Sequence, residues 1–310
     1  MLLAPTAPNK RTIVRKNVGF GLARAAFSVG SWIAPAATID RAIGLFCTPS
    51  VDARQRARTA DARGATASRL DASDRGIEVY CWGDAAVQPY VLLAHGWSDF
   101  GLRFVPLAEA LRAAGYAVVA FDQPGHGRSD GDTATLPEFA SAVGTVGAHF
   151  GPAAAVIGHS MGGAAAAIAL RDGLAADRAI LVAPPADLAA AADRFAGLVG
   201  LAPHLHERLR KTLETRVSVR FEDVEAHRHV PAIDRPALII HDLDDREVPW
   251  SEGERYARYW PDSRLLTTTG LGHNRILGDT AVIGAMLDFL RGEPVGERVV
   301  STGALPFGIA

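Results

Sequence analysis

One uncharged stretch, from Ala153 to Leu170, constrains the fold of this chain more than any other part of it. It reads AAAVIGHSMGGAAAAIAL and contains no Asp, Glu, Lys or Arg. Pro152 and several glycines interrupt any single membrane-spanning helix through the stretch. A short apolar run followed by an Ala-rich segment instead predicts a buried strand, a sharp turn and a buried helix.

The turn carries Ser160 between Gly158 and Gly162, in the pattern G-x-S-x-G. A serine held on a tight strand-to-helix turn takes a strained backbone and needs neighbours without a Cβ. Its hydroxyl is then exposed at the end of the strand. The backbone N–H of Met161 begins the helix and is a candidate donor to a substrate oxyanion. Ser160 is therefore a candidate nucleophile.

A nucleophilic serine needs a base and an acid that orients the base, and both occur downstream. The apolar run 237–240 leads into three carboxylates, Asp242, Asp244 and Asp245. Farther on, His273 follows Gly272 in a Gly-flanked loop and is the candidate base. The order Ser, Asp, His fits a catalytic triad, although the residues alone do not select one of the three acids.

Two turns near the amino end of the chain belong to the same expected site. Trp97 follows the apolar run 90–94, where its backbone N–H is a candidate second oxyanion donor and its indole a candidate wall of the acyl pocket. The segment 121–130 is rich in Pro and Gly, and Asp122 and His126 are expected to brace this loop.

Apolar runs alternate with helical patterns over most of the chain. This alternation predicts a mostly parallel sheet with helices on both faces and a ligand site at the carboxyl ends of the strands. The expected core covers 65–182 and 236–292. Strands are expected at 65–70, 77–82, 90–94, 117–121, 153–157, 179–182, 237–240 and 265–268, and helices at 104–114, 138–150, 161–172, 253–259 and 281–291.

The connection 183–235 is too long for an ordinary loop. Leu188 to Leu201 and Pro203 to Val217 read as two helices, which we interpret as a small lid over Ser160. The apolar residues of the first helix either face substrate or pack on the body. The expected pocket residues are His159, Trp97, Phe195 and Leu198.

These motifs together resemble the α/β-hydrolase superfamily of serine esterases and lipases, in its short-capped group with G-H-S-M-G. The matching residues are His95-Gly96, the segment Asp122 to Ser129, the turn at Ser160, D-x-x-V-P from Asp245, and Gly272-His273. The resemblance implies an α/β-hydrolase fold, Asp245 as the triad acid with Asp244 as its rival, Trp97 and Met161 as the oxyanion hole, and no cofactor.

The expected reaction is hydrolysis of carboxylic esters through an acyl-enzyme, with short to medium acyl esters or monoacylglycerol-like lipids as substrates. Thioester hydrolysis, carbon–carbon bond hydrolysis and perhydrolysis on the same triad remain alternatives. Epoxide hydrolases and dehalogenases of this fold use Asp where Ser160 stands and are disfavoured. A non-catalytic receptor for a small ligand is the alternative outside enzymes.

Residues 1–64 lie outside the resemblance and read as a basic arm with a helical extension. Five basic residues precede the first acidic residue, Asp40. Val18, Leu22, Ala25, Val29 and Ile33 fall near one helical face, which is expected to pack on the body, with an anionic membrane surface as the alternative. A secretion signal is disfavoured. The Arg-rich region 52–64 is expected to be a solvated linker, and 293–310 a C-terminal tail.

Charge and cysteine content add further limits. The formal net charge is −2, which implies no nucleic-acid partner. Cys47 and Cys81 show no metal or redox spacing and suit a reducing compartment, so the expected location is cytoplasmic. His204, His206, His227 and His229 lack acidic partners at metal spacing, and no metal site is expected.

Overall fold

The computed structural model describes residues 10–72 and 75–299, and side chains over 20–71 and 75–299. The chain divides into two compact units. The first, which we call the helical unit, comprises Met1–Phe46 and Ala189–Ser218. The second, which we call the sheet unit, comprises Cys47–Leu188 and Val219–Ala310. Each unit therefore consists of two separate segments of the chain.

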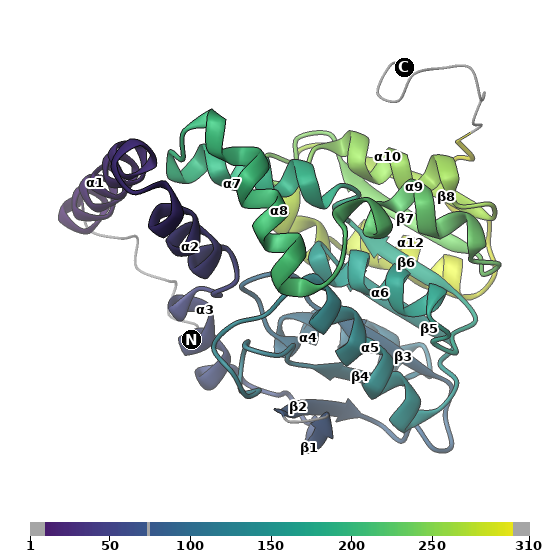
Figure 1. Ribbon diagram of the computed structural model, residues 1–310. Coiled ribbons are helices and arrows are strands. Elements are labelled where there is room, and N and C mark those ends of the chain that lie inside the picture. Colours follow the sequence, from purple (N-terminus) through teal and green to yellow (C-terminus); the bar gives the residue numbers. More distant parts are fainter. Residues whose placement is uncertain (1–9, 73–74, 300–310) are drawn as a thin grey trace. The chain divides into compact units, whose positions relative to one another are not determined.

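An eight-stranded sheet forms the centre of the sheet unit (Figure 1). Its order is β1-β2-β4-β3-β5-β6-β7-β8, in which β1 and β2 are antiparallel to their neighbours and the other strands are parallel. The strands are β1 (Thr66–Ala72), β2 (Arg75–Trp82), β3 (Tyr90–Ala94), β4 (Ala117–Phe121), β5 (Ala155–His159), β6 (Ala179–Val182), β7 (Ala237–Asp242) and β8 (Ser263–Thr268).

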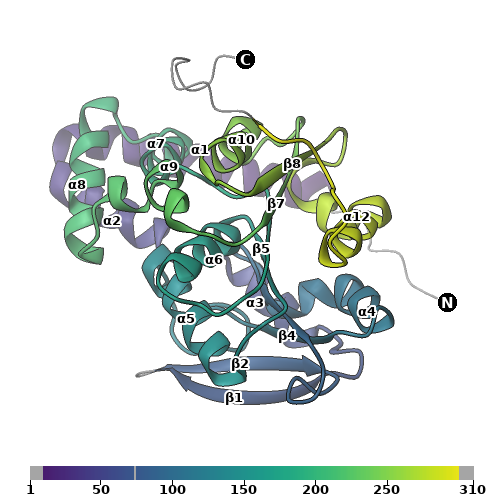
Figure 2. The same cartoon turned by 90° about the vertical axis from the view of Figure 1, so that its right-hand side faces the viewer.

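Helices cover both faces of this sheet, as the near-continuous burial of β3 to β7 requires (Figure 2). One face packs on α5, α6, α9 and α10, and the other on α3, α4 and α12. Their bounds are α3 (Val51–Thr59), α4 (Val105–Ala113), α5 (Leu136–Phe150), α6 (Met161–Arg171), α9 (Ala226–His229), α10 (Trp250–Tyr259) and α12 (Thr280–Leu290), with the short α11 (Gly272–Arg275).

All eight expected strands and all five expected core helices are present, with shifts of a few residues at their ends. The fold class predicted from the alternation of apolar and helical patterns is therefore confirmed. The parallel strands also end at one edge of the sheet, where Ser160 follows β5 and Asp245 comes three residues after β7. Of the expected tail, Glu297 forms a bridge with Leu265, and 300–310 lie outside the described residues.

The expectation of a solvated linker at 52–64 is wrong, because its first half is helix α3. Ala57 of α3 is fully buried in the core on one face of the sheet. Arg54 donates to the Ser129 carbonyl at 2.8 Å and pairs with Asp132 at 2.8 Å. Small alanines supply the buried face of this helix, while its arginines reach the neighbouring loop.

The helical unit is built from helices of its two chain segments. It contains α1 (Lys10–Ile33), α2 (Pro35–Phe46), α7 (Leu188–Val199, whose first residue belongs to the sheet unit) and α8 (His206–Val217). The Ala202 N–H donates to Ser31 Oγ at 3.1 Å, and Arg216 pairs with Asp40 at 2.6 Å. The two helices expected in the connection 183–235 are present, and they form one unit with the N-terminal helices.

Helix α1 does not bury the face on which the sequence pattern placed its packing. Leu22, Val29 and Ile33 are 68%, 56% and 79% exposed, whereas Phe27 is buried. Within the helical unit, the packed side of α1 is therefore the one that carries Phe27, and packing of the Leu22–Ile33 face on the sheet unit stays a prediction. Among the described residues, no helix is long and apolar enough to cross a membrane.

Candidate active site

Ser160 occupies the sharp turn between β5 and α6, with φ 52° and ψ −128°. A positive φ is costly for a residue with a Cβ and persists only where the surroundings enforce it. The Ser160 N–H donates to the Val182 carbonyl of β6 at 2.8 Å, which ties the turn to the neighbouring strand. The strained turn predicted from G-x-S-x-G is thus present.

Three glycines let the backbone close around Ser160. A Cβ on Gly158 would lie 2.4 Å from the Gly162 carbonyl oxygen, and one on Gly162 would lie 2.3 Å from the Ala94 carbonyl oxygen. A Cβ on Gly96 would lie 2.8 Å from the Ser160 Cβ. Because real Cβ contacts are longer than these, each glycine is required by close approach rather than by local flexibility.

The two expected oxyanion donors are both available. Met161 is the first residue of α6, and Trp97 lies in the turn after β3. Among the described residues, neither the Met161 N–H nor the Trp97 N–H has a hydrogen-bond acceptor. Unpaired backbone N–H groups beside a nucleophile are the donors that an oxyanion requires.

Two buried histidines hold the Trp97 turn in place. His95 Nε2 accepts from the Gln123 N–H at 2.9 Å, and His126 Nε2 accepts from the Ser98 N–H at 3.0 Å. Burial lowers the pKa of His95 to about 4 and that of His126 to about 3. Both rings are therefore neutral near pH 7, with Nδ1 of each directed at a backbone carbonyl.

Asp122 braces the adjoining loop, as expected. Its carboxylate accepts from Tyr80 Oη at 2.8 Å and from the N–H groups of Gly101 and Arg128 at 2.7 Å each. Burial raises the pKa of this carboxyl above its usual range despite these donors. Because Asp122 is saturated by local partners, it is a structural group.

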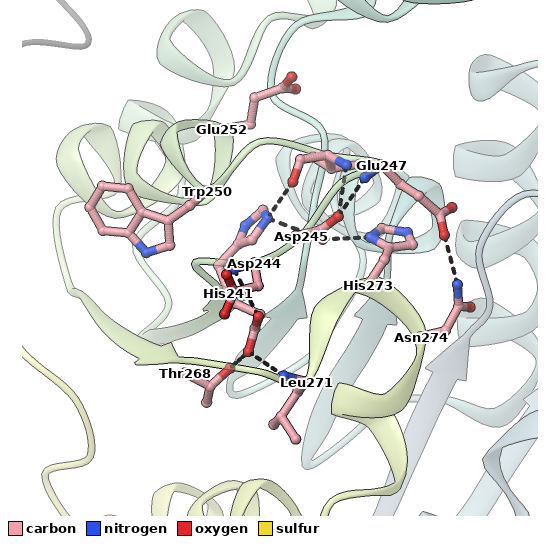
Figure 3. A network of polar contacts seen from close by, with 12 residues as sticks. His241, Asp244, Asp245, Glu247, Trp250, Glu252, Thr268, Leu271, His273 and Asn274 are labelled. Atoms are coloured by element: carbon pink, nitrogen blue, oxygen red, sulfur yellow. Dashed lines mark hydrogen bonds and ion pairs between the residues drawn. The ribbon is translucent and has the colours of Figure 1, made fainter.

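His273 lies in α11 and its Nδ1 is 2.7 Å from Asp245 Oδ2 (Figure 3). The Asp245 side chain is fully buried, and that of His273 is 7% exposed. Asp245 Oδ1 accepts from the N–H groups of Glu247 and Val248 at 2.8 and 2.9 Å. These two donors fix the carboxylate, so its second oxygen is directed at the imidazole.

The other two acids of this cluster hold the loop that carries His273. Asp242 Oδ2 accepts from Thr268 Oγ1 at 2.7 Å and from the Leu271 N–H at 3.1 Å. Asp244 Oδ2 accepts from the Gly270 N–H at 2.8 Å. Of the three carboxylates that the sequence left open, only Asp245 contacts His273.

A second imidazole, which the sequence analysis missed, also faces Asp245. His241 is fully buried on β7, with Nε2 3.5 Å from Asp245 Oδ2 and 3.0 Å from the Val248 carbonyl oxygen. Burial raises the pKa of Asp245, but hydrogen bonds from His241, His273 and the Val248 N–H outweigh burial and bring it well below its usual range. Asp245 is therefore ionised at neutral pH.

His159, which the sequence placed in the substrate pocket, is only 2% exposed. Its Nε2 lies 2.9 Å from the His273 carbonyl oxygen, and the two rings are 4.8 Å apart. Burial lowers the pKa of His159 to about 3, so the neutral ring donates from Nε2 to this carbonyl. His159 thus connects the Ser160 turn to α11 and offers no side-chain surface to substrate.

The remaining expected pocket residues lie in different units. Trp97, in the sheet unit, is half-buried against His126 and Phe139. Phe195 and Leu198 lie in α7 of the helical unit, where the Phe195 ring contacts the Phe46 ring at 5.0 Å. Their contact with a substrate stays a prediction. Within 10–72 and 75–299, no group of three His, Cys, Asp or Glu residues could hold a metal ion.

Comparison with known proteins identifies the family. Residues 85–241, half of the chain, match the model of the family described as serine aminopeptidase, S33. The chain belongs to this family of α/β hydrolases. It is also 30% identical, over 228 residues, to the pimeloyl-[acyl-carrier protein] methyl ester esterase of Xanthomonas campestris pv. campestris (strain B100), covering 61% of this chain and 90% of the relative. This relative places the hydrolase among the carboxylic ester hydrolases.

Solved structures share the fold of this hydrolase at low identity. The thioesterase domain from the curacin biosynthetic pathway superimposes with a TM-score of 0.55, at 21% identity, covering 74% of this chain and 100% of that domain. A membrane phospholipase A described as a bacterial virulence factor gives a TM-score of 0.57 at 18% identity, covering 90% of this chain and 99% of its own. Proteins with different acyl substrates thus share the fold of this hydrolase.

Proposed function

We propose that this hydrolase is a serine esterase in which Ser160 is the nucleophile, His273 the base and Asp245 the orienting acid. The observation that carries the proposal is the 2.7 Å contact of His273 Nδ1 with the buried Asp245, at the sheet edge where Ser160 is held on its strained turn. The N–H groups of Trp97 and Met161 form the oxyanion hole.

The reaction proceeds in two acyl-transfer steps. Ser160 Oγ attacks the ester carbonyl carbon while its proton moves to His273 Nε2, and the carbonyl oxygen becomes an oxyanion held by the two N–H groups. Collapse of this intermediate breaks the ester bond, and His273 gives the proton to the departing alcohol. Water then attacks the acyl-enzyme, with His273 again taking and returning one proton, and the carboxylic acid leaves.

Asp245 serves this cycle as a fixed anion. Because hydrogen bonds keep its pKa well below the usual range, it remains a carboxylate whenever His273 becomes an imidazolium. Its Oδ2 accepts from His273 Nδ1, which leaves Nε2 as the proton-accepting nitrogen. The tautomer and orientation of the base therefore follow from the contact with Asp245.

The first test compares the wild-type protein with Ser160→Ala on p-nitrophenyl esters of increasing acyl length, with a fluorophosphonate probe as a label. We expect Ser160→Ala to lower kcat by several orders of magnitude and to abolish labelling, with an unchanged circular dichroism spectrum. Unchanged ester hydrolysis by this variant would remove Ser160 from the mechanism.

The substrate class is proposed as short to medium acyl esters or monoacylglycerol-like lipids. Thioester hydrolysis is the second candidate, because the esterase relative acts on an acyl group carried by an acyl-carrier protein. Acyl thioesters and an aminoacyl p-nitroanilide belong in the same assay. Labelling at Ser160 without turnover of any of these would favour carbon–carbon bond hydrolysis, perhydrolysis or a ligand receptor.

We also propose a cytoplasmic location with peripheral membrane contact through the N-terminal segment. The basic residues before Asp40 support this proposal, as does the content of only two cysteines, neither of which forms a disulfide. Fractionation of the native cells into cytosol and washed membranes tests it, with release by high salt expected for a peripheral protein.

A further inference from the structure

Helix α1 exposes a strip of large apolar side chains that nothing in the catalytic mechanism uses. Leu22, Val29, Trp32 and Ile33 lie within about a third of the helix circumference at 100° per residue. The exposed fractions of Trp32 and Ile33 are 75% and 79%. Within the helical unit, the ring of His204 lies beside Trp32 but leaves most of this side chain exposed. Contiguous exposed apolar surface marks an interaction site.

The opposite side of α1 is fixed to the rest of the helical unit. Phe27 and Ser31 are buried, and Ser31 Oγ accepts from the Ala202 N–H. Arg24 donates to the Gly197 carbonyl at 2.9 Å and to that of Leu198, at the carboxyl end of α7. A cation bound to the last carbonyls of a helix is favoured by the helix dipole. The strip is therefore held outward by specific contacts and is not a loose packing face.

We propose that this strip binds the surface of an anionic lipid membrane. The sequence of the same helix begins with Lys10, Arg11, Arg15 and Lys16, and the chain has no acidic residue before Asp40. Such a segment is attracted to the negative surface of an anionic bilayer, while apolar side chains enter the boundary between headgroups and acyl chains. Trp32 is a residue type that favours this boundary.

A second copy of this chain is the competing occupant, and the charges disfavour it. Pairing α1 with α1 would bring together two copies of the same four basic residues. Helix α1 contains no acidic residue to offset their repulsion. An anionic lipid surface supplies the opposite charge instead. The lipid surface also accommodates an exposed strip without a matching groove.

Helix α1 also contacts the segment inserted between β6 and β7. Trp32 lies against His204, with ring centroids 4.6 Å apart, and the Arg24 contacts reach the end of α7. A membrane that orders the strip therefore orders the whole helical unit, including α7 and α8. This inference stands independently of the proposed triad, since no residue of the strip belongs to the sheet unit.

The experiment is co-sedimentation of the full-length protein with vesicles of phosphatidylglycerol and phosphatidylcholine, and with vesicles of phosphatidylcholine alone. We expect binding to the anionic vesicles that falls steeply as the salt concentration of the assay is raised from about 0.05 to about 0.5 M. Over this range the Debye length shortens from about 14 to about 4 Å, which screens the attraction between the basic residues and the lipid headgroups. Each basic residue contributes about fivefold to binding, so Lys10→Ala/Arg11→Ala should weaken it about 25-fold. Trp32→Ser/Ile33→Ser should weaken it about tenfold or more.

Val87→Ser is the matched control, because Val87 is 78% exposed on the sheet unit and lies outside α1. It should bind vesicles as the wild-type protein does, and Ser160→Ala should do the same. Equal binding by wild type and Trp32→Ser/Ile33→Ser, or no binding to anionic vesicles, would overturn the proposal. Loss of a dimer in Trp32→Ser/Ile33→Ser without any vesicle binding would assign the strip to self-association instead.

Discussion

Acidification should destabilise the sheet unit through His126, the buried ring that holds the turn of Trp97. In the folded protein, burial lowers the pKa of His126 to about 3, against 6.5 for a solvated histidine. Below pH 6.5 the unfolded chain binds a proton at this residue, whereas the folded chain does not until the pH approaches its lowered pKa. Unfolding therefore takes up a proton, and stability falls as the pH falls from about 6.5 towards 3.

The size of this effect at pH 5 depends little on the lowered pKa itself. At pH 5, His126 is almost fully protonated in the unfolded chain and almost fully neutral in the folded one. The loss of unfolding free energy is therefore set by the difference between pH 5 and the unfolded pKa of 6.5. This pH difference corresponds to about 2 kcal/mol of unfolding free energy, at about 1.36 kcal/mol per pH unit. His95, His159 and His229 are buried with lowered pKa values and act in the same direction.

Urea unfolding at pH 7 and pH 5 measures the contribution of His126 when wild type is compared with His126→Gln. The glutamine removes the ring from Trp97 and Phe139 and so lowers stability at both pH values. The informative quantity is the loss between the two pH values, which should be about 2 kcal/mol smaller in the variant. His149→Gln is the control, since this ring is exposed on α5.

An identical loss in wild type and His126→Gln would exclude His126 as a source of the pH dependence. It would mean that His126 takes up a proton in the folded state at pH 5 without cost. A smaller loss in His149→Gln as well would show that the change comes from general charge effects instead of from the buried ring.

Three further changes test the site directly. Gly162→Ala places a Cβ 2.3 Å from the Ala94 oxygen and should lower kcat/KM about 100-fold, whereas Gly144→Ala, with no atom within 4 Å of the added Cβ, should leave activity unchanged. Asp245→Asn should lower kcat about 10⁴-fold and Asp244→Asn less than about tenfold, and the reverse order would assign the acid to Asp244. His241→Phe removes a hydrogen bond to the Asp245 carboxylate and should lower kcat about tenfold, and an unchanged kcat would leave His241 a packing role.

The sheet could be predicted from the sequence because its strands are buried on both faces and read as apolar runs. The Ser160 turn could be predicted because close approach of backbone to backbone permits only glycine at Gly158 and Gly162. The close approach of Gly158 to Gly162 is local and that of Gly162 to Ala94 is distant in the sequence, but both leave glycines in a recognisable pattern. They remain visible in a single sequence without any knowledge of distant contacts.

The parts that the sequence missed depend on long-range contacts. The buried face of α3 consists of Ala53 and Ala57, which carry little apolar signal among four nearby arginines. The direction of each carboxylate after β7 depends on which loop N–H groups it accepts from, so residue types could not separate Asp245 from Asp242 and Asp244. His241 directly follows the expected strand 237–240 and gave no signal of a role, since its contact with Asp245 forms only when the following turn folds back.

The discontinuous helical unit has a consequence for synthesis of the chain. Phe46 leaves the ribosome about 140 residues before Ala189, so α1 and α2 are made long before α7 and α8, with which they pack. At about 5–20 residues per second, this interval lasts roughly 7–30 s. During that time Phe27 and Ser31 lack the partners that cover them in the finished unit, and the nascent N-terminal helices present apolar surface on both sides. Chaperone or membrane capture of the growing chain would therefore begin before the sheet is complete.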